Sequence, residues 1–123
     1  MSQYDVAGVY RIKHKESDRS YIGQSIDVMG RWRAHIRNAY QPQPTSSIAY
    51  AIKREGPEAF TFSIEARMDG TLSSKYLTRL LKEKEVELVA HYDSHHNGYN
   101  CDDGGNTGNT WRGDYVAPNN KLF

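Results

Sequence analysis

The hydrophobic and polar positions of the chain first predict a β-hairpin near its start. Residues 6–13 (VAGVYRIK) alternate well enough for a strand, and residues 20–24 (SYIGQ) form a second short run of the same kind. The polar, turn-forming segment KESDR lies between them. Residues 59–66 (AFTFSIEA) predict a third strand, because apolar residues recur at every second position. This alternation places one set of side chains on the same face of the strand, namely Phe60, Phe62, Ile64 and Ala66.

Three further segments carry the spacing of amphipathic helices. The first runs from residue 27 to about residue 39 and ends before the segment QPQP. Its N-cap candidates are Ser25 and Asp27, and its apolar stripe is Val28, Trp32 and Ile36. The second runs over residues 46–55, and the Gly56-Pro57 pair ends it; its inward residues are Ile48, Ala49 and Ile52. The third runs over residues 73–92, with a stripe of Leu77, Leu80, Leu81, Leu88 and Tyr92.

The order of these elements is strand, strand, helix, helix, strand, helix. Gly, Asn and Asp dominate the residues from Asn97 onward, a composition typical of irregular loops. No internal repeat or second domain is visible, and 123 residues fit one compact domain. Three strands covered by helices predict a small α+β fold.

Composition and charge exclude several classes of protein. Hydrophobic residues make up 37% and charged residues 25% of the chain, as in soluble globular proteins. No apolar run approaches the roughly 18 residues of a membrane span. The opening MSQYDVAG lacks the features of a secretory signal, so a cytoplasmic location is expected. The single cysteine, Cys101, cannot form an internal disulfide. The net charge is only +1, yet seven basic residues against three acidic ones lie between Gly8 and Tyr40.

Glu85 lies close to the apolar stripe of the third predicted helix. It follows Leu81 and precedes Leu88 by about one turn each, whereas Glu83 and Glu87 point away from the stripe. A carboxylate near a buried face costs free energy unless a cation, a metal or hydrogen bonds compensate. Glu85 is therefore a candidate ligand, and the alternative is a residue at the edge of the stripe that simply reaches water.

Four other residues form patterns that suit phosphate chemistry. Arg31 and His35 lie four apart on one helical face, beside the apolar stripe, and Arg can bind a phosphate with two donors at once. Tyr10 and Tyr21 lie on the two predicted hairpin strands, each beside a glycine in mirrored order. Each pattern has an ordinary alternative. Exposed Arg and His on a helix are commonly just solvated, and cross-strand aromatic pairs commonly only stabilise sheets.

Taken together, five landmarks occur in a fixed order along the chain. They are Gly8-Val9-Tyr10, Tyr21-Ile22-Gly23, the pair Arg31 and His35, the segment AIKREGPEAFTFSIEA, and Glu85 ahead of NGYN. In this order they resemble the GIY-YIG nuclease superfamily, most of all the catalytic modules of phage-type homing endonucleases. The resemblance runs from about residue 6 to residue 108, with Val9 in place of an equally β-branched Ile. It predicts a nuclease domain over residues 1–108 and a C-terminal tail over residues 109–123.

The resemblance implies a three-stranded antiparallel sheet flanked by about three helices, and a metal-dependent DNA endonuclease. The catalytic residues that it implies are Tyr10, Tyr21, Arg31, His35, Glu85 and Asn100. Glu85 would hold one Mg²⁺ or Mn²⁺ ion; the stripe geometry and the step to Asn100 select it over Glu83 and Glu87. The family spacing likewise favours Arg31 over Arg33 for the phosphate. Predicted contacts with nucleic acid are Gly23, Lys13, Arg33 and Arg37. The mirrored glycines would let backbone turns and DNA approach closely.

The implied chemistry is the hydrolysis of a phosphodiester bond. In this hypothesis Tyr10 is the general base for water, Arg31 stabilises the transition state, and the metal on Glu85 stabilises the leaving oxygen. A free tyrosine titrates near pH 10, so Tyr10 needs nearby positive charge, which His35, the metal and the basic hairpin would provide. Two rival interpretations are a catalytically silent nucleic-acid-binding module and a repair or restriction nuclease of the same superfamily.

DNA is the expected partner, with no role for a membrane. The small net charge predicts weak, salt-sensitive binding, because affinity for DNA grows with the number of phosphates neutralised. One site of this type cuts one strand, so a double-strand break would require a dimer or two successive visits, and a partner protein could supply specificity. The expected setting is the cytoplasm of a bacterium or of a phage-infected host cell.

Overall fold

The computed structural model describes residues 6–68 and 72–101. Its elements follow the predicted order, with one additional turn of 3-10 helix. They are β1 (Ala7–His14), β2 (Ser20–Ser25), α1 (Val28–Ala39), α2 (Ser47–Glu55), the 3-10 helix η1 (Pro57–Ala59), β3 (Phe60–Met68) and α3 (Ser74–Tyr92). Within these described ranges, no helix has both the length and the apolar character that crossing a bilayer requires.

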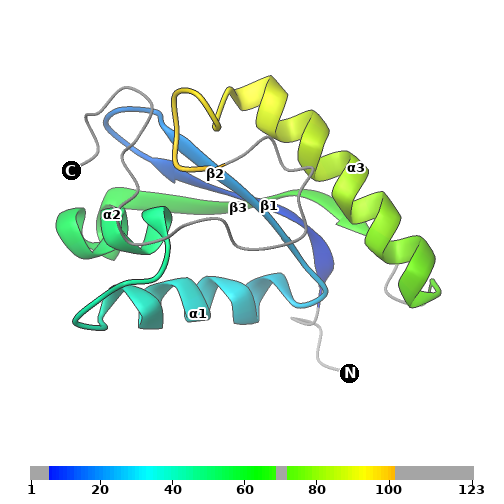
Figure 1. Ribbon diagram of the computed structural model, residues 1–123, viewed down its shortest axis with the longest axis horizontal. Coiled ribbons are helices and arrows are strands. Elements are labelled where there is room, and N and C mark those ends of the chain that lie inside the picture. The colour runs from blue at the N-terminus through cyan, green and yellow to red at the C-terminus, as the bar shows by residue number, and fades with distance from the viewer. Residues whose placement is uncertain (1–5, 69–71, 102–123) are drawn as a thin grey trace.

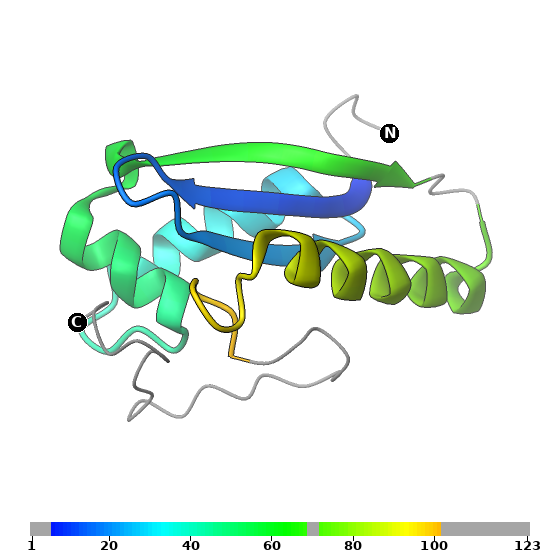
Figure 2. The same ribbon diagram turned by 90° about the horizontal axis from the view of Figure 1, so that it is seen from above.

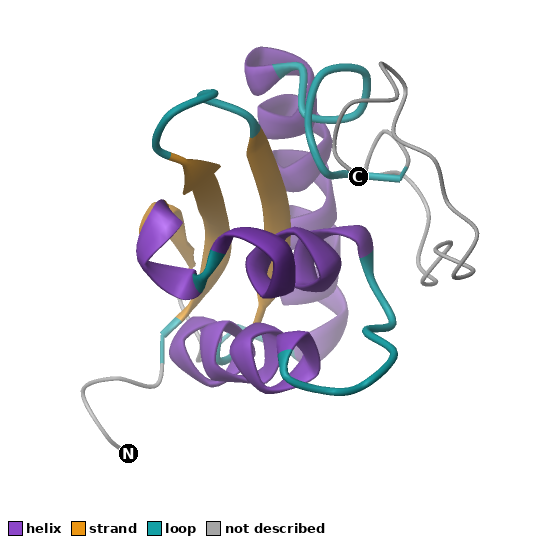
Figure 3. Ribbon diagram, turned by 90° about the vertical axis from the view of Figure 1, so that its left-hand side faces the viewer, coloured by secondary structure: helices purple, strands orange, loops and turns teal. Residues whose placement is uncertain are grey.

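The three strands form one antiparallel sheet with β1 in the centre. The strand order is β2-β1-β3, and Figure 2 shows β1 between the other two strands. The helices α1 and α2 lie on one face of this sheet and α3 lies on the other (Figure 1, Figure 3). This arrangement confirms the predicted α+β fold, a small three-stranded antiparallel sheet flanked by three α-helices.

Each face of the sheet has its own hydrophobic core, because side chains alternate between the two faces along β1. On the α1 and α2 side the buried core residues are Tyr10, Ile12, Val28, Ala39, Ile48, Ala49, Ala51, Ile52, Phe60 and Tyr99. On the α3 side they are Ala7, Val9, Ile22, Leu77, Leu81, Leu88 and Val89. The predicted stripe of α3 is buried at Leu77, Leu81 and Leu88, whereas Leu80 and Tyr92 are half-buried.

A β-bulge in β3 overturns one prediction about the third strand. Tyr10 pairs with Ile64, and the preceding residue Val9 pairs with Ala66, so Glu65 has no partner in the ladder. One extra residue moves every later side chain to the opposite face. Ile64 therefore packs on the α1 side, whereas Ala66 packs on the α3 side. The prediction that Ala66 shares a face with Ile64 was wrong for this reason.

The buried face of α1 also differs from the predicted stripe. The buried residues of this helix are Val28, His35 and Ala39, while Trp32 is half-buried and stacks on Phe62 with 5.1 Å between ring centroids. His35 had been predicted to lie beside the stripe, yet it is 6% exposed. An inward-facing polar side chain is tolerated when it is hydrogen-bonded, and His35 has such a partner in Tyr10.

Side-chain caps fix where the helices begin. Asp27 is the N-cap of α1, as predicted, and its Oδ1 accepts a hydrogen bond of 3.1 Å from the backbone N–H of Gly30. Ser25, the other candidate, lies outside the helix and accepts from the N–H of Asp27. Ser46 and Ser73 cap α2 and α3 in the same way. Capping satisfies N–H groups that have no partner inside the helix, and typically contributes about 1 kcal/mol.

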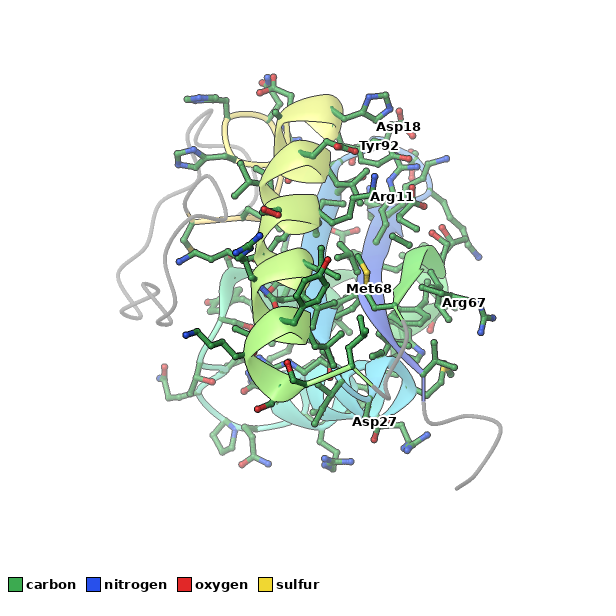
Figure 4. All side chains as sticks on the ribbon, turned by 90° about the vertical axis from the view of Figure 1, so that its right-hand side faces the viewer. Arg11, Asp18, Asp27, Arg67, Met68 and Tyr92 are labelled. Carbon is green, nitrogen blue, oxygen red and sulfur yellow. The ribbon has the colours of Figure 1, made fainter. Side chains whose placement is uncertain are left out.

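A polar cluster holds the C-terminal end of α3 against the sheet. The Arg11 guanidinium lies 3.9 Å from the centroid of the Tyr92 ring, and Figure 4 shows Arg11, Tyr92 and Asp18 gathered beside this end of the helix. The Arg11 Nε also donates to Ser20 Oγ at 2.7 Å. The Tyr92 hydroxyl donates to Oε1 of Glu65 at 2.6 Å. The bulge residue Glu65 thus serves as an acceptor that joins β3 to α3.

Candidate active site

Two tyrosines and a histidine from three elements form one buried cluster. The Tyr10 hydroxyl of β1 lies 2.7 Å from Nε2 of His35 on α1. The ring centroid of Tyr21, on β2, lies 6.2 Å from that of Tyr10 and 5.3 Å from that of His35. Tyr10 is fully buried, whereas Tyr21 is half-buried. The predicted convergence of Tyr10, Tyr21 and His35 is therefore present in the structure.

The mirrored glycines of the sequence have a packing explanation. Gly23 pairs with Tyr10 across the hairpin, and a Cβ added at Gly23 would overlap the hydroxyl and ring of Tyr10. A Cβ added at Gly8 would overlap the backbone carbonyl of Ala66 beside the bulge. The close approach that these glycines permit is thus to a ring and to a strand of the protein itself. A contact between Gly23 and DNA stays a prediction.

Burial and charge set the ionisation of this cluster. Burial, helped by the neighbouring Tyr21, raises the pKa of Tyr10 well above its ordinary value, although Arg31 acts in the opposite direction. Burial and the positive charge of Arg31 together lower the pKa of His35 to about 4. His35 is therefore neutral at pH 7, and its Nε2 shares the 2.7 Å hydrogen bond with the Tyr10 hydroxyl, which donates when the imidazole proton is on Nδ1. The expectation that His35 supplies positive charge to Tyr10 was wrong, because a buried imidazole disfavours the charged form.

Arg31 lies in the first turn of α1, where the helix presents it to solvent. Its backbone N–H donates to the carbonyl of the N-cap residue Asp27 at 3.0 Å. Its charge lowers the pKa of both Tyr10 and His35, so the guanidinium lies within electrostatic range of both groups. The preference for Arg31 over Arg33 as the residue that meets a phosphate stays a prediction.

Glu85 approaches this cluster from the opposite face of the sheet. It belongs to α3, which covers the other face of the sheet from Tyr10. Its charge nevertheless raises the pKa of Tyr10, so the carboxylate is close enough to affect Tyr10 around the edge strand β2. Its Oε1 accepts a hydrogen bond of 3.1 Å from Nε2 of Gln24, on β2. Glu83 and Glu87 are exposed, as the stripe geometry predicted. They pair with Arg79 and Lys84 of the same helix.

Gln24 is a residue of this region that sequence reasoning missed. It follows the Tyr21-Ile22-Gly23 motif directly, and side chains alternate along a strand, so Gln24 lies on the same face of β2 as Ile22. That face is the one covered by α3. The alternation of the predicted strand was therefore a signal that could have paired Gln24 with the third helix.

Asn100 is buried, 6% exposed, and its amide is engaged by the backbone of β2. Its Oδ1 accepts from the N–H of Ile22 at 2.8 Å, and its Nδ2 donates to the carbonyl of Ile22 at 2.8 Å. The next residue back, Tyr99, donates its N–H to the carbonyl of Ser20 at 2.9 Å. Asn100 thus holds the outer edge of β2 between Tyr21 and Gly23, and a direct part in the chemistry stays a prediction.

The other predicted DNA contacts lie on two surfaces. Arg33 and Arg37 are exposed on α1, the helix that carries Arg31. Lys13 lies on the side of β1 that Arg11 shares with α3, and its Nζ pairs with Asp18 at 3.1 Å. Lys13 therefore projects from the face of the sheet opposite Tyr10, while the two arginines lie on the same side as Tyr10.

The carboxylate chemistry of the region fits one hard divalent cation. Within residues 6–68 and 72–101, no group of three or more His, Cys, Asp or Glu side chains is placed to enclose a metal ion. Mg²⁺ does not need such a cage, since it commonly binds one or two carboxylates together with water and substrate phosphates. Glu85, which accepts a hydrogen bond from Gln24 of the edge strand β2 and acts electrostatically on Tyr10, is suited to that mode of binding.

The chain matches the family model described as the GIY-YIG catalytic domain over residues 6–100. Among solved structures it is similar to a Glu-to-Ala mutant of the catalytic domain of the intron endonuclease I-TevI, with 24% identity, a TM-score of 0.68, and coverage of 80% of this chain and 95% of that one. It is also similar to the catalytic domain of the homing endonuclease I-TevI, with 23% identity, a TM-score of 0.65, and coverage of 78% and 98%. These similarities show a shared fold. No curated protein sequence matches the chain. The landmarks, the fold and the family match agree: the chain belongs to the GIY-YIG family of nuclease catalytic domains.

Proposed function

We propose that this domain is a divalent-metal-dependent DNA endonuclease that hydrolyses a phosphodiester bond with one metal ion. The observation that carries the proposal is the convergence of Tyr10, His35, Arg31 and Glu85. These residues come from β1, α1 and α3. Tyr10 and His35 share a hydrogen bond, Arg31 acts on the pKa of both, and Glu85 acts on the pKa of Tyr10. Membership of the GIY-YIG family supports the nuclease activity.

Arg31 binds the scissile phosphate in the proposed mechanism. A guanidinium presents parallel N–H donors that match two phosphate oxygens, and its charge opposes the negative charge that builds up during hydrolysis. When held by Glu85, a Mg²⁺ or Mn²⁺ ion supplies Lewis-acid stabilisation of the same charge and of the leaving oxygen. Gln24 keeps the Glu85 carboxylate turned toward this position through its hydrogen bond.

A proton relay through Tyr10 and His35 activates the water. Burial raises the pKa of Tyr10, so a preformed phenolate is not available at pH 7. Neutral His35 accepts the Tyr10 proton on Nε2 as Tyr10 takes the proton of the attacking water, and a phenolate never accumulates. A bound phosphate next to His35 favours the imidazolium that results, because an anion stabilises a neighbouring cation.

Tyr21 is a second candidate for the residue that meets the water, because Tyr10 is 0% exposed and Tyr21 is half-buried. Tyr10→Phe and Tyr21→Phe distinguish the two routes. The variant that lacks the base loses roughly 10²-fold or more in single-turnover cleavage rate, at unchanged affinity for DNA. Equal losses of rate and affinity in both variants would mean that the hydroxyls only position the substrate.

The proposal includes the boundaries and partners expected from the sequence. The nuclease domain occupies residues 1–108 and a tail occupies residues 109–123, of which residues 102–123 lie outside the described part of the chain. DNA is the partner, and a dimer or a partner protein supplies specificity. The proposed setting is the cytoplasm of a bacterial or phage-infected cell.

Incubation with supercoiled plasmid tests the function. With Mg²⁺ the wild-type protein should convert supercoiled plasmid to nicked circles and then to linear DNA, and excess EDTA should abolish the conversion. Unchanged plasmid with both Mg²⁺ and Mn²⁺, together with measurable DNA binding, would favour the rival interpretation of a silent binding module. Cleavage restricted to branched or damaged duplexes would favour a repair nuclease of the same family.

A further inference from the structure

A pocket lies between the turn of the β1–β2 hairpin and the C-terminal end of α2. Its volume is about 180 Å³, well above the roughly 10–15 Å³ that one water molecule requires. Its polar lining residues are His14, Ser17, Arg19, Arg54, Glu55 and Tyr99. The pocket shares no residue with the candidate active site.

Among the described residues that line this pocket, Arg19 is the cation outside any ion pair. Its two arginines and one glutamate give the lining a net positive charge, with His14 counted as neutral. Glu55 is engaged inside the pocket, because its carboxylate lies 3.4 Å from Nε of Arg54 and 3.8 Å from Nε2 of His14. Arg19 forms no ion pair with any other residue that the structure describes.

Hydroxyl groups converge on the same space. The Ser17 Oγ lies 2.7 Å from Nδ1 of His14. The Tyr99 hydroxyl is close to Ser17, and the positive charges of Arg19 and Arg54 both act on it. A guanidinium flanked by hydroxyl donors is a suitable environment for a phosphate, because phosphate oxygens accept several hydrogen bonds at once.

The pocket and the candidate active site lie on the same side of the sheet. Ala51 of α2 lines the pocket and also belongs to the core that contains Tyr10. The backbone hydrogen bond from His14 N to Arg19 O continues the hairpin ladder, so Arg19 precedes Tyr21 by two strand residues. The backbone distance between Arg19 and Tyr21 is therefore roughly 7 Å. One strand of DNA presents a phosphate at every 3.4 Å or so of helix axis, so a single strand can reach both places.

We propose that this pocket binds a backbone phosphate of the DNA strand that the active site cuts, with Arg19 as its principal ligand. The proposal rests on the proposed nuclease function and adds to it a second contact beside the scissile phosphate. A phosphate contact fixes the position and orientation of the protein on DNA without reading the base sequence. Glu55 opposes the bound phosphate by its charge, and its pairing with Arg54 limits that opposition.

Two substitutions with opposite expected effects test the proposal. Binding of the 123-residue chain to a fluorescein-labelled duplex is measured by anisotropy in EDTA, from about 50 to about 200 mM NaCl. Arg19→Ala should weaken binding roughly tenfold at the lowest salt and reduce the slope of log K against log[NaCl] by about one. Glu55→Gln should tighten binding. The matched controls, Arg79→Ala and Glu83→Gln, change an exposed ion pair on α3 and should give smaller effects.

Further measurements keep the outcomes separate. Arg19→Lys retains the charge and should recover the salt slope, and thermal unfolding by circular dichroism checks that every variant is folded. Inorganic phosphate at constant ionic strength should displace DNA from the wild type and not from Arg19→Ala, because both ligands compete for the pocket. If phosphate raises the unfolding temperature of the wild type but not of Arg19→Ala, while both bind DNA equally well, the occupant is free phosphate and the proposal is wrong. Equal slopes for Arg19→Ala and Arg79→Ala would also overturn it. A wild type that binds but does not cleave, with the slope still reduced in Arg19→Ala, would contradict only the nuclease function.

Discussion

His35 makes the stability of the protein depend on pH. Burial beside Tyr10 and the charge of Arg31 lower its pKa from 6.5 to about 4. In the unfolded chain the imidazole takes up a proton as the pH falls through about 6.5, while in the folded protein it does so only near pH 4. Acidification between these values therefore favours unfolding. The contribution of neutral His35 to the free energy of unfolding is fully present above about pH 6.5. It falls by about 3 kcal/mol as the pH drops across this window, and it is lost below about pH 4.

Urea unfolding at a series of pH values between about 7 and 4 measures this effect. His35→Gln can still accept the Tyr10 hydroxyl through its side-chain oxygen, but it gains no proton. Its unfolding free energy should therefore change less with pH than that of the wild type, while the exposed control His91→Gln should follow the wild type. Identical pH profiles for wild type and His35→Gln would contradict the assignment of a buried, neutral His35.

Gln24 is expected to position the Glu85 carboxylate rather than to touch the reacting atoms. Gln24→Ala removes the 3.1 Å hydrogen bond to Glu85, and loss of such a supporting contact typically costs 10- to 100-fold or so in metal affinity or activity. Cleavage rates measured against Mg²⁺ concentration should show a higher Mg²⁺ requirement at unchanged affinity for DNA. The exposed control Gln41→Ala should behave as the wild type. An unchanged Mg²⁺ dependence in Gln24→Ala would remove this role.

At the scale of elements, β2 is held from outside by Asn100. Asn100→Ala would leave both the N–H and the carbonyl of Ile22 without their buried partner, at a cost of about 1–3 kcal/mol for each group. Hydrogen exchange of the Ile22 amide should become faster, and the free energy of unfolding should fall. Asn100→Asp keeps an acceptor for the N–H but loses the donor, so an intermediate effect is expected. Wild-type exchange at Ile22 in Asn100→Ala would contradict this account.

The elements themselves were predictable because each combines a clear period with clear ends. Asp27 and Ser46 are capping residues, and Gly56 ends α2 with a φ of 91° that suits glycine. The bulge was not predictable, because apolar residues continue to alternate through Ala66 and nothing in the sequence marks Glu65 as the extra residue. The inward side of α1 was missed because a buried His35 becomes favourable only when Tyr10 lies opposite.

At the scale of the whole molecule, most residues of the candidate site were predicted from the resemblance to GIY-YIG nucleases, which rests on the order of the landmarks along the chain. Periodicity gave Glu85 a place near the stripe of α3, but it could not show that α3 lies on the opposite side of the sheet from Tyr10. Alternation along β2 assigns Gln24 to the face of Ile22, but it could not select Glu85 as its partner, because that contact joins β2 to α3 across 61 residues of sequence. Contacts of this length depend on the packing of the whole domain.

The central claim is that Glu85 acts past the edge of β2 on the same phosphate that Arg31 and Tyr10 approach from the other side. The most direct test is the single-turnover rate of plasmid nicking by Glu85→Gln, compared with Glu83→Gln and Glu87→Gln on the same helix. Each variant removes one carboxylate and keeps nearly the same shape. The account predicts a loss of roughly 10²-fold or more for Glu85→Gln and nearly wild-type rates for the other two. Equal rates for all three variants would contradict it.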